Sequence, residues 1–239
     1  MRNTSRLILG ELHRLVIYKI LPISLLVAIF WVIILLFVSK EDALNVAPLF
    51  VIIDVCMMSI LLIGASHHLE KQEGTIKSMM MMPISLGQIL IAKFVASLVL
   101  GIESVIIISA ALFFIHGLTF NYALLLFFII IAGAVHAAIA FFLSLSSKDF
   151  SSMLVLLMAY LIPLGIPTML FAFGMIDAKY EWILMLSPVH SSSNLITSAI
   201  SGKFEVSKVI IGCVYLVLLT AALFKFAVYP KFKNNAVRG

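Results

Sequence analysis

The residues of this chain best suited to specific chemistry form a short polar stretch between two long apolar segments. Residues 70–78 read EKQEGTIKS, and four methionines and Pro83 follow them. Carboxylate and ammonium groups in such a stretch can pair with charges on a soluble partner, and methionine is flexible enough to fill an irregular groove on another protein. The stretch therefore indicates a partner-binding site; the simpler alternative is a solvated loop whose methionines rest on lipid.

Three ionisable residues lie inside apolar segments: Asp54, Glu103 and His136. At about 1.5 Å of rise per residue they lie roughly 18, 21 and 15 Å from the cytoplasmic ends of their helices, so they can share one layer near mid-membrane. Ionisable residues at this depth are costly and are functional candidates, here for a cationic or amphipathic substrate or for proton sharing. The structural alternative is a protonated Glu103 hydrogen-bonded between helices.

A metal site would have to start from His67, His68 and Glu70, where His67 and Glu70 are spaced i, i+3 on one helix face. No third and fourth ligand follows at a recognisable spacing, so ordinary interfacial histidines are the favoured interpretation. Cys56 and Cys213 lie in apolar segments and read as small hydrophobic residues. We therefore predict neither a metal centre nor a catalytic residue in this chain.

The elements that must position these residues are membrane spans. Hydrophobic residues make up 63% of the 239 residues, charged residues 11%, and the mean hydropathy is +1.21. A span needs about 20 apolar residues. The sequence thus predicts one all-α polytopic membrane domain over residues 1–239, with six transmembrane helices at approximately 21–38, 47–66, 89–115, 122–146, 153–176 and 208–229.

The basic residues predict the orientation of these spans. Twelve of the sixteen Lys and Arg residues fall on the side that holds both termini, and four fall on the other side. By the positive-inside rule, both termini are cytoplasmic. The net charge of +5 thus reflects topology and does not indicate nucleic acid binding.

Two helices outside the spans are expected on the cytoplasmic side. Residues 1–20 alternate polar and apolar residues at helical spacing, which predicts an interfacial helix; a positively flanked start of the first span is the alternative. Gly74 and Pro83 delimit a short helix at 74–82 within a cytoplasmic segment at 67–84. Ser85 and Gln88 fit a capping box for the next span.

Two further features concern the outer half of the chain. Residues 177–207 are too apolar for a free loop and too short and polar for two spans, so we expect two short re-entrant helices, around 180–187 and 190–201. In the fifth span, Pro163, Gly165 and Pro167 predict a kink or a break. That kink is either a hinge or a plain structural feature.

The polar stretch and its surroundings resemble a known family. The pattern Glu70–Ile76, then Pro83-Ile84-Ser85 and Ile91-Ala92-Lys93, is similar to a segment of the type-2 permeases of ATP-binding-cassette exporters. The resemblance extends to six spans, an N-terminal interfacial helix and a long loop before the last span. In that family the segment is a coupling helix seated in a cleft of the ATP-hydrolysing subunit, which implies that Glu70, Glu73, Gly74, Thr75 and Lys77 couple this chain to an ATPase.

The resemblance implies a non-enzymatic permease in a bacterial-type plasma membrane, which exports a drug, an antimicrobial peptide or a secreted peptide toxin. The partners would be ATPase subunits that bind ATP and Mg²⁺ and a second permease, identical or related. The chain itself has no GxxxxGK[ST] phosphate loop, so we expect no cofactor on it. Two other hypotheses remain: an ion-coupled secondary transporter, although no internal repeat is visible, and an intramembrane metalloenzyme.

Overall fold

The structure, a computed structural model, describes residues 2–238, with the side chains of all of these except residues 2, 3, 76, 77, 80 and 236–238. The chain is 86% helical, and the described residues form no strand, which confirms the all-α prediction. The helical elements run in the order α1 Arg2–Ile17, α2 Ile20–Leu35, α3 Lys40–Ile52, the π-helix η1 Ile53–Met58, α4 Ser59–Gln72, α5 Thr75–Met80, α6 Leu86–His116, α7 Tyr122–Ser146, α8 Phe150–Ala172, the 3-10 turn η2 Ala178–Tyr180, α9 Glu181–Leu184, α10 Pro188–Ser201, α11 Val206–Leu223, the π-helix η3 Phe224–Val228 and α12 Tyr229–Arg238.

Among the described residues, five helices are long and apolar enough to cross a bilayer: Lys40–Gln72, Leu86–His116, Tyr122–Ser146, Phe150–Ala172 and Val206–Asn235. A sixth span is obtained if α1 and α2, which meet at an angle of 65°, count together. The bend lies at Lys19, whose φ of +58° is left-handed. The chain is thus an all-α polytopic membrane protein.

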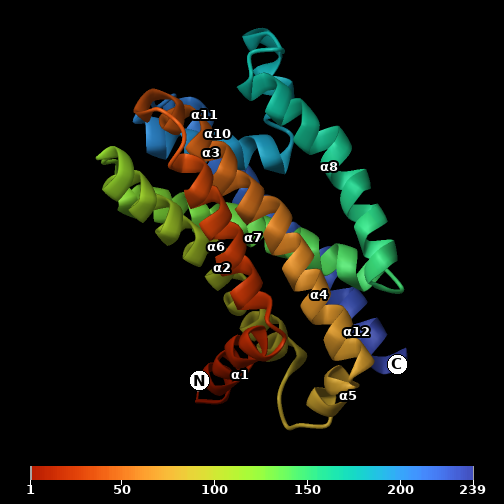
Figure 1. Ribbon diagram of the computed structural model, residues 1–239. Coiled ribbons are helices and arrows are strands. Elements are labelled where there is room, and N and C mark those ends of the chain that lie inside the picture. The colour runs from red at the N-terminus through yellow and green to blue at the C-terminus, as the bar shows by residue number, and fades with distance from the viewer. Residues whose placement is uncertain (1, 239) are drawn as a thin grey trace.

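The central helix of the bundle is α7, which contacts α4, α6, α8, α10 and α11. Small residues on α7, among them Ala132, Gly133, Ala137 and Ala140, allow neighbouring helices to approach closely. In contrast, little of two other helices is buried within this chain: 22% of the apolar stretch of α8, and 11% of the apolar stretch of Val206–Asn235. Figure 1 shows α8 diverging from the rest of the bundle.

The ends of the chain and the short helix α5 lie at the same end of the bundle, whereas α10 and the start of α3 lie at the other (Figure 1). The C-terminal helix α12 contacts α5 directly. The short helix predicted for the polar stretch is present as α5, at Thr75–Met80. The predicted capping box at Ser85 and Gln88 is also confirmed, because both of its hydrogen bonds are made.

Both prolines of the fifth span lie within a continuous α8, so the predicted break is absent. The hydroxyl groups of Thr168 and Ser187 both donate to the carbonyl oxygen of Leu164, at 2.9 and 3.1 Å. The bond from Ser187 ties α8 to the N-cap residue of α10. Whether Pro163, Gly165 and Pro167 form a hinge stays a prediction.

The segment before the last long helix is helical, as expected, although its first helix is shorter than expected. Helix α9 has four residues and α10 has fourteen. Glu181 at the start of α9 pairs with Lys208 of α11 at 2.6 Å, and α10 packs against α3, α7, α8 and α11. The depth of this segment in the membrane stays a prediction.

A tight contact between α4, α7 and α8 generates a stability prediction. A Cβ added to Gly64 would overlap the sulfur and terminal methyl of Met153, which is fully buried and also contacts Ser144. Gly64→Ala should therefore lower stability by about 1–3 kcal/mol through overpacking. Thermal unfolding of the purified protein in detergent would measure the loss.

Gly10→Ala is the matched control, since Gly10 is an exposed helical glycine with open space around its Cβ position. Alanine is favoured over glycine in a helix by about 1 kcal/mol, at both sites alike. The difference in stability between the two variants therefore measures the effect of overpacking at Gly64 alone. Equal unfolding temperatures for both variants would contradict a close α4–α8 contact.

Candidate functional site

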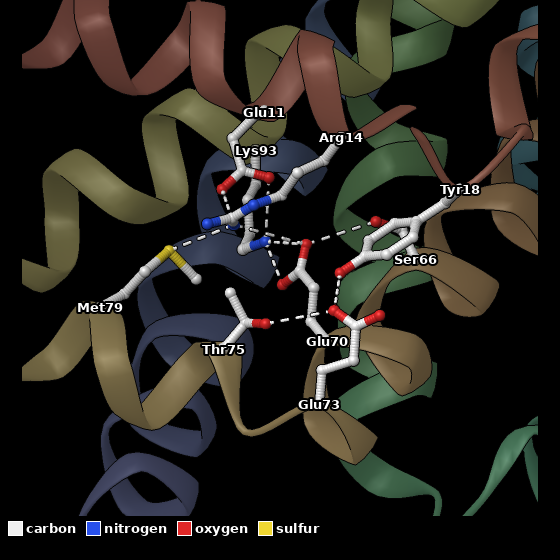
Figure 2. A network of polar contacts seen from close by, with 9 residues as sticks. All are labelled: Glu11, Arg14, Tyr18, Ser66, Glu70, Glu73, Thr75, Met79 and Lys93. Atoms are coloured by element: carbon white, nitrogen blue, oxygen red, sulfur yellow. Dashed lines mark hydrogen bonds and ion pairs between the residues drawn. The ribbon is translucent and has the colours of Figure 1, made fainter. Parts of the chain in front are cut away.

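The candidate site is a buried ion network centred on Glu70, at the end of α4. Nζ of Lys93, on α6, lies 2.6 Å from Oε1 of Glu70 and also contacts Oε2. The same Nζ lies 3.1 Å from Oε2 of Glu11 on α1 (Figure 2). Glu70 is fully buried, and Glu11 and Lys93 are 6% and 7% exposed. Three helices that are far apart in the sequence are thus joined by one ammonium group.

Arg14 completes the network from α1. Its Nη1 lies 3.0 Å from Oε1 of Glu11 and 3.9 Å from Oε1 of Glu70. The same group donates to the sulfur of Met79, on α5, at 3.3 Å. The network holds two carboxylates and two cations, so it is balanced in charge, which is the condition under which buried charges are tolerated.

Local structure explains why these side chains meet. Glu11 and Arg14 are spaced i, i+3 and share one face of α1. Adjacent apolar residues hold α1 against the bundle, since Leu15 packs in one cluster with Leu62 of α4 and Ala96 of α6. The amphipathic pattern of residues 1–20 therefore seats α1 on the ends of α4 and α6.

A second link joins α1 to the polar stretch. The hydroxyl of Tyr18, between α1 and α2, donates to Oε2 of Glu73 at 2.5 Å, and the hydroxyl of Thr75 donates to the same oxygen at 3.4 Å. Burial and then the hydrogen bond to Glu73 raise the pKa of Tyr18 to about 12. Tyr18 therefore keeps its proton at neutral pH and remains a donor.

Gly74 makes the turn between α4 and α5. Its φ of +69° lies in the left-handed region, which costs a residue with a side chain about 1–2 kcal/mol. After this turn, α5 runs back so that Met79 is buried against Arg14. The Glu-Gly-Thr pattern thus has a physical basis: Glu73 and Thr75 share a hydrogen-bonding network around a glycine turn.

The structure places the predicted coupling residues in two different environments. Glu70 is enclosed by α1 and α6, whereas Glu73 is exposed and Gly74 and Thr75 are partly exposed. The side chain of Lys77 lies outside the described residues. The assignment of all five to an ATPase surface stays a prediction. The described side chains that are exposed in this segment are Lys71, Gln72, Glu73, Ser78, Met81, Met82 and Pro83.

Sequence reasoning missed the partners of Glu70 on α1. The pattern of residues 1–20 predicts only an interfacial helix, on which Glu11 and Arg14 are two of the polar residues. One signal was available: Lys93 is a single cation within an apolar span, and a buried lysine requires a carboxylate. The sequence did not show which carboxylate, because Glu11 lies 82 residues away.

The three ionisable residues predicted for a substrate pathway have different surroundings in the structure. Asp54 accepts a hydrogen bond from Nε1 of Trp31 at 2.9 Å and another from the hydroxyl of Ser104, the residue after Glu103. His136 is fully buried, its Nδ1 2.8 Å from the carbonyl oxygen of Ala132 and its Nε2 3.2 Å from the hydroxyl of Tyr160. His136 therefore links α7 to α8, while Asp54 and Glu103 lie on neighbouring elements. Their role in transport stays a prediction.

The two histidines near the end of α4 have separate surroundings. Nε2 of His68 lies 3.0 Å from the hydroxyl of Ser147, and Glu70 is bound to Lys93. In the part of the chain that the structure describes, no group of three or more His, Cys, Asp or Glu side chains is arranged to hold a metal ion.

The ion network generates a double-mutant prediction. Glu70→Gln alone leaves one carboxylate with two cations, the buried Lys93 and the partly exposed Arg14, and Lys93→Met alone leaves two carboxylates with one cation. Each should destabilise the protein by about 3–5 kcal/mol. The double variant leaves the balanced pair of Glu11 and Arg14, so its loss should be much smaller than the sum, as unfolding in denaturing detergent would measure. Additive losses would show that the two residues do not act as a pair.

The sequence of this chain matches a protein-family model, that of the ABC-2 family transporter protein. The match covers residues 40–229, which is well over half of the chain and includes the polar stretch. No curated protein matches significantly. The chain belongs to the ABC-2 family of transporter proteins.

Proposed function

We propose that this chain is the membrane-spanning permease subunit of an ATP-driven exporter and that a separate subunit hydrolyses Mg-ATP. Membership of the ABC-2 family supports a permease, and the chain has no phosphate loop of its own. The cargo that fits best is hydrophobic or amphipathic, such as a drug, an antimicrobial peptide or a secreted peptide toxin. The described residues 2–238 form membrane helices and short connections, so this part of the protein offers no soluble domain for handling a polymer.

The observation that carries this proposal is the anchoring of the polar stretch from the inside. On the inner side, Glu70 binds Lys93 of α6, which also binds Glu11 of α1. Glu73 binds Tyr18, directly after α1, and Met79 binds Arg14 of α1. On the other side, Met81 and Met82 are 88% and 51% exposed. An ATPase subunit that binds the exposed side would thereby move the stretch together with α1 and α6. A solvated loop would not need the ion network.

The uncovered apolar surfaces support a second permease subunit, identical or related. Most of the apolar surface of α8 and of Val206–Asn235 is left exposed by this chain. We assign these faces to lipid and to the second subunit. The excess of Lys and Arg at the end that holds α1, α5 and α12 supports a cytoplasmic location for that end, in a bacterial-type cell.

The outer end of the pathway is proposed to be closed by α9 and α10. The Ser187 hydroxyl, which caps α10, also binds the carbonyl of Leu164, between Pro163 and Gly165 of α8. The ring of His190 lies edge-on to Phe171 of α8, 5.1 Å away. A bend of α8 at its prolines would therefore move α10, which is how the hinge and the outer helices would act together.

The docking part of the proposal is tested with an exposed methionine. Met81→Asp places a charge on the surface assigned to the ATPase and should lower the amount of ATPase subunit that co-purifies with the tagged chain by at least about tenfold, which corresponds to about 1.4 kcal/mol. Mass spectrometry of complexes purified from native membranes would measure it.

Met175→Asp is the matched control, because Met175 is 73% exposed in the connection after α8, outside the polar stretch. It should leave the ATPase bound. Equal recovery of the ATPase with both variants would refute the docking surface. Transport that persists without any ATPase subunit would favour a secondary transporter instead.

A further inference from the structure

The carboxyl group of Glu103 has an unusual environment within α6. Both of its oxygens are enclosed by protein and meet no hydrogen-bond donor in the described part of the chain, although the side chain as a whole is only partly buried. Buried polar groups nearly always have a partner, so one without any requires an explanation. An ionised carboxylate enclosed in this way is strongly unfavourable unless a cation reaches it.

A second carboxyl group is bound by Ser104, the residue that follows Glu103. Asp54, in the π-helix η1, is 5% exposed and is oriented by Trp31 of α2 and Ser104 of α6. The charges of Asp54 and Glu103 repel each other when both are ionised. Neither takes part in an ion pair among the described residues. This layer of the protein therefore has acidic groups that are not balanced by cations.

An aromatic stack borders the same site. The indole of Trp31, whose N–H binds Asp54, stacks on Phe50 with ring centroids 4.6 Å apart and planes 16° from parallel. Phe30 meets the edge of the same indole at 5.4 Å. Carboxylates beside aromatic rings are the combination that binds organic cations, because both attract positive charge while the rings also contact apolar groups.

We propose that Glu103, Asp54 and Trp31 form a recognition site for a lipophilic organic cation, such as the charged group of an amphipathic cargo. The cation would interact with the free oxygens of Glu103, with Asp54 as the second anionic group and Trp31 as the aromatic wall. The π-helix favours this location, since such insertions occur frequently at functional sites. The inference rests on the proposed function and names the class of its substrate.

The site is closed in the described conformation, so binding requires a change in the packing around α6. Glu103 follows Ala96 and Leu100 at i+7 and i+3, and these residues pack in one cluster with Ile20 of α2. Glu103 thus belongs to the face of α6 that meets α2. Separation of α2 from α6 would open the site to a cation.

The test uses tetraphenylphosphonium as the cation and tetraphenylborate as an anion of matched size and shape. The full chain with Trp182→Phe, which leaves Trp31 as its one tryptophan, is placed in nanodiscs of zwitterionic phosphatidylcholine. The cation should change Trp31 fluorescence saturably, and the anion should not. Glu103→Gln should weaken the apparent affinity for the cation at least about tenfold, as expected for loss of one charged partner. Glu103→Asp should retain most of it.

Glu41→Gln is the control for a carboxyl group outside this layer, because Glu41 is exposed in the first turn of α3. It should bind the cation as the parent does. Unchanged affinity in Glu103→Gln, saturable binding of the anion, or absence of saturable cation binding in the parent would each overturn the proposal. Circular dichroism establishes that each variant is folded.

The result can be separated from the proposed function. Glu103→Gln should leave the ATPase subunit bound, because Glu103, although it lies on α6 as Lys93 does, is not a member of the ion network. Failure of the ATPase to co-purify with the parent chain would refute the exporter proposal and leave the cation measurement intact. Intact ATPase binding without cation binding would refute the cation site alone.

Discussion

The arrangement of the end of the bundle that holds α1 and α5 depends on the buried ion pair between Lys93 and Glu70. In a bilayer, lipid competes with protein for every apolar surface, so apolar contact alone gives little preference for one position of a helix. A buried ammonium group is stable only in an arrangement that brings carboxylates to it. The position of α1 across α4 and α6 follows from this requirement, because Glu11 of α1 binds the same ammonium group. Arg14 of α1 binds Glu11 and so balances the charge of the second carboxylate. The apolar contacts of Leu15 then add to a geometry already specified by charge.

This constraint also explains how a short polar stretch acquires a defined structure. A six-residue helix such as α5 is too short to be stable alone. It is held because Gly74 turns the chain back, Glu73 binds Tyr18, and Met79 is buried against Arg14. The residues bound on the inner side leave Met81 and Met82 exposed on the outer side. The outer surface of this stretch is thus held in place by contacts that lie behind it.

The sequence was sufficient to predict local features and insufficient for contacts between distant residues. Long apolar segments, the cap at Ser85 and the turn at Gly74 follow from short stretches of sequence, and the structure contains all of them. The pairing of Glu11 with Lys93 does not, since several carboxylates could have satisfied the lysine. The two prolines of α8 show the same limit: proline predicts a kink or a break from its own chemistry, but α8 is one continuous helix through both of them.

The two polar layers of the molecule differ in how their groups are satisfied, and this difference separates structural from functional roles. At the end of the bundle that holds α1 and α5, two carboxylates meet two cations, and both oxygens of Glu70 contact Lys93. In the membrane layer, His136 is likewise bonded at both ring nitrogens, to Ala132 and Tyr160. Among the described residues, neither oxygen of Glu103 has a hydrogen-bond partner, and on α10 the ring of His190, the hydroxyl of Ser192 and the amide oxygen of Asn194 also lack one. Because stability alone favours full pairing of buried polar groups, we assign the partner of the Glu103 carboxyl, which is set among acidic rather than basic groups, to a molecule from outside the chain.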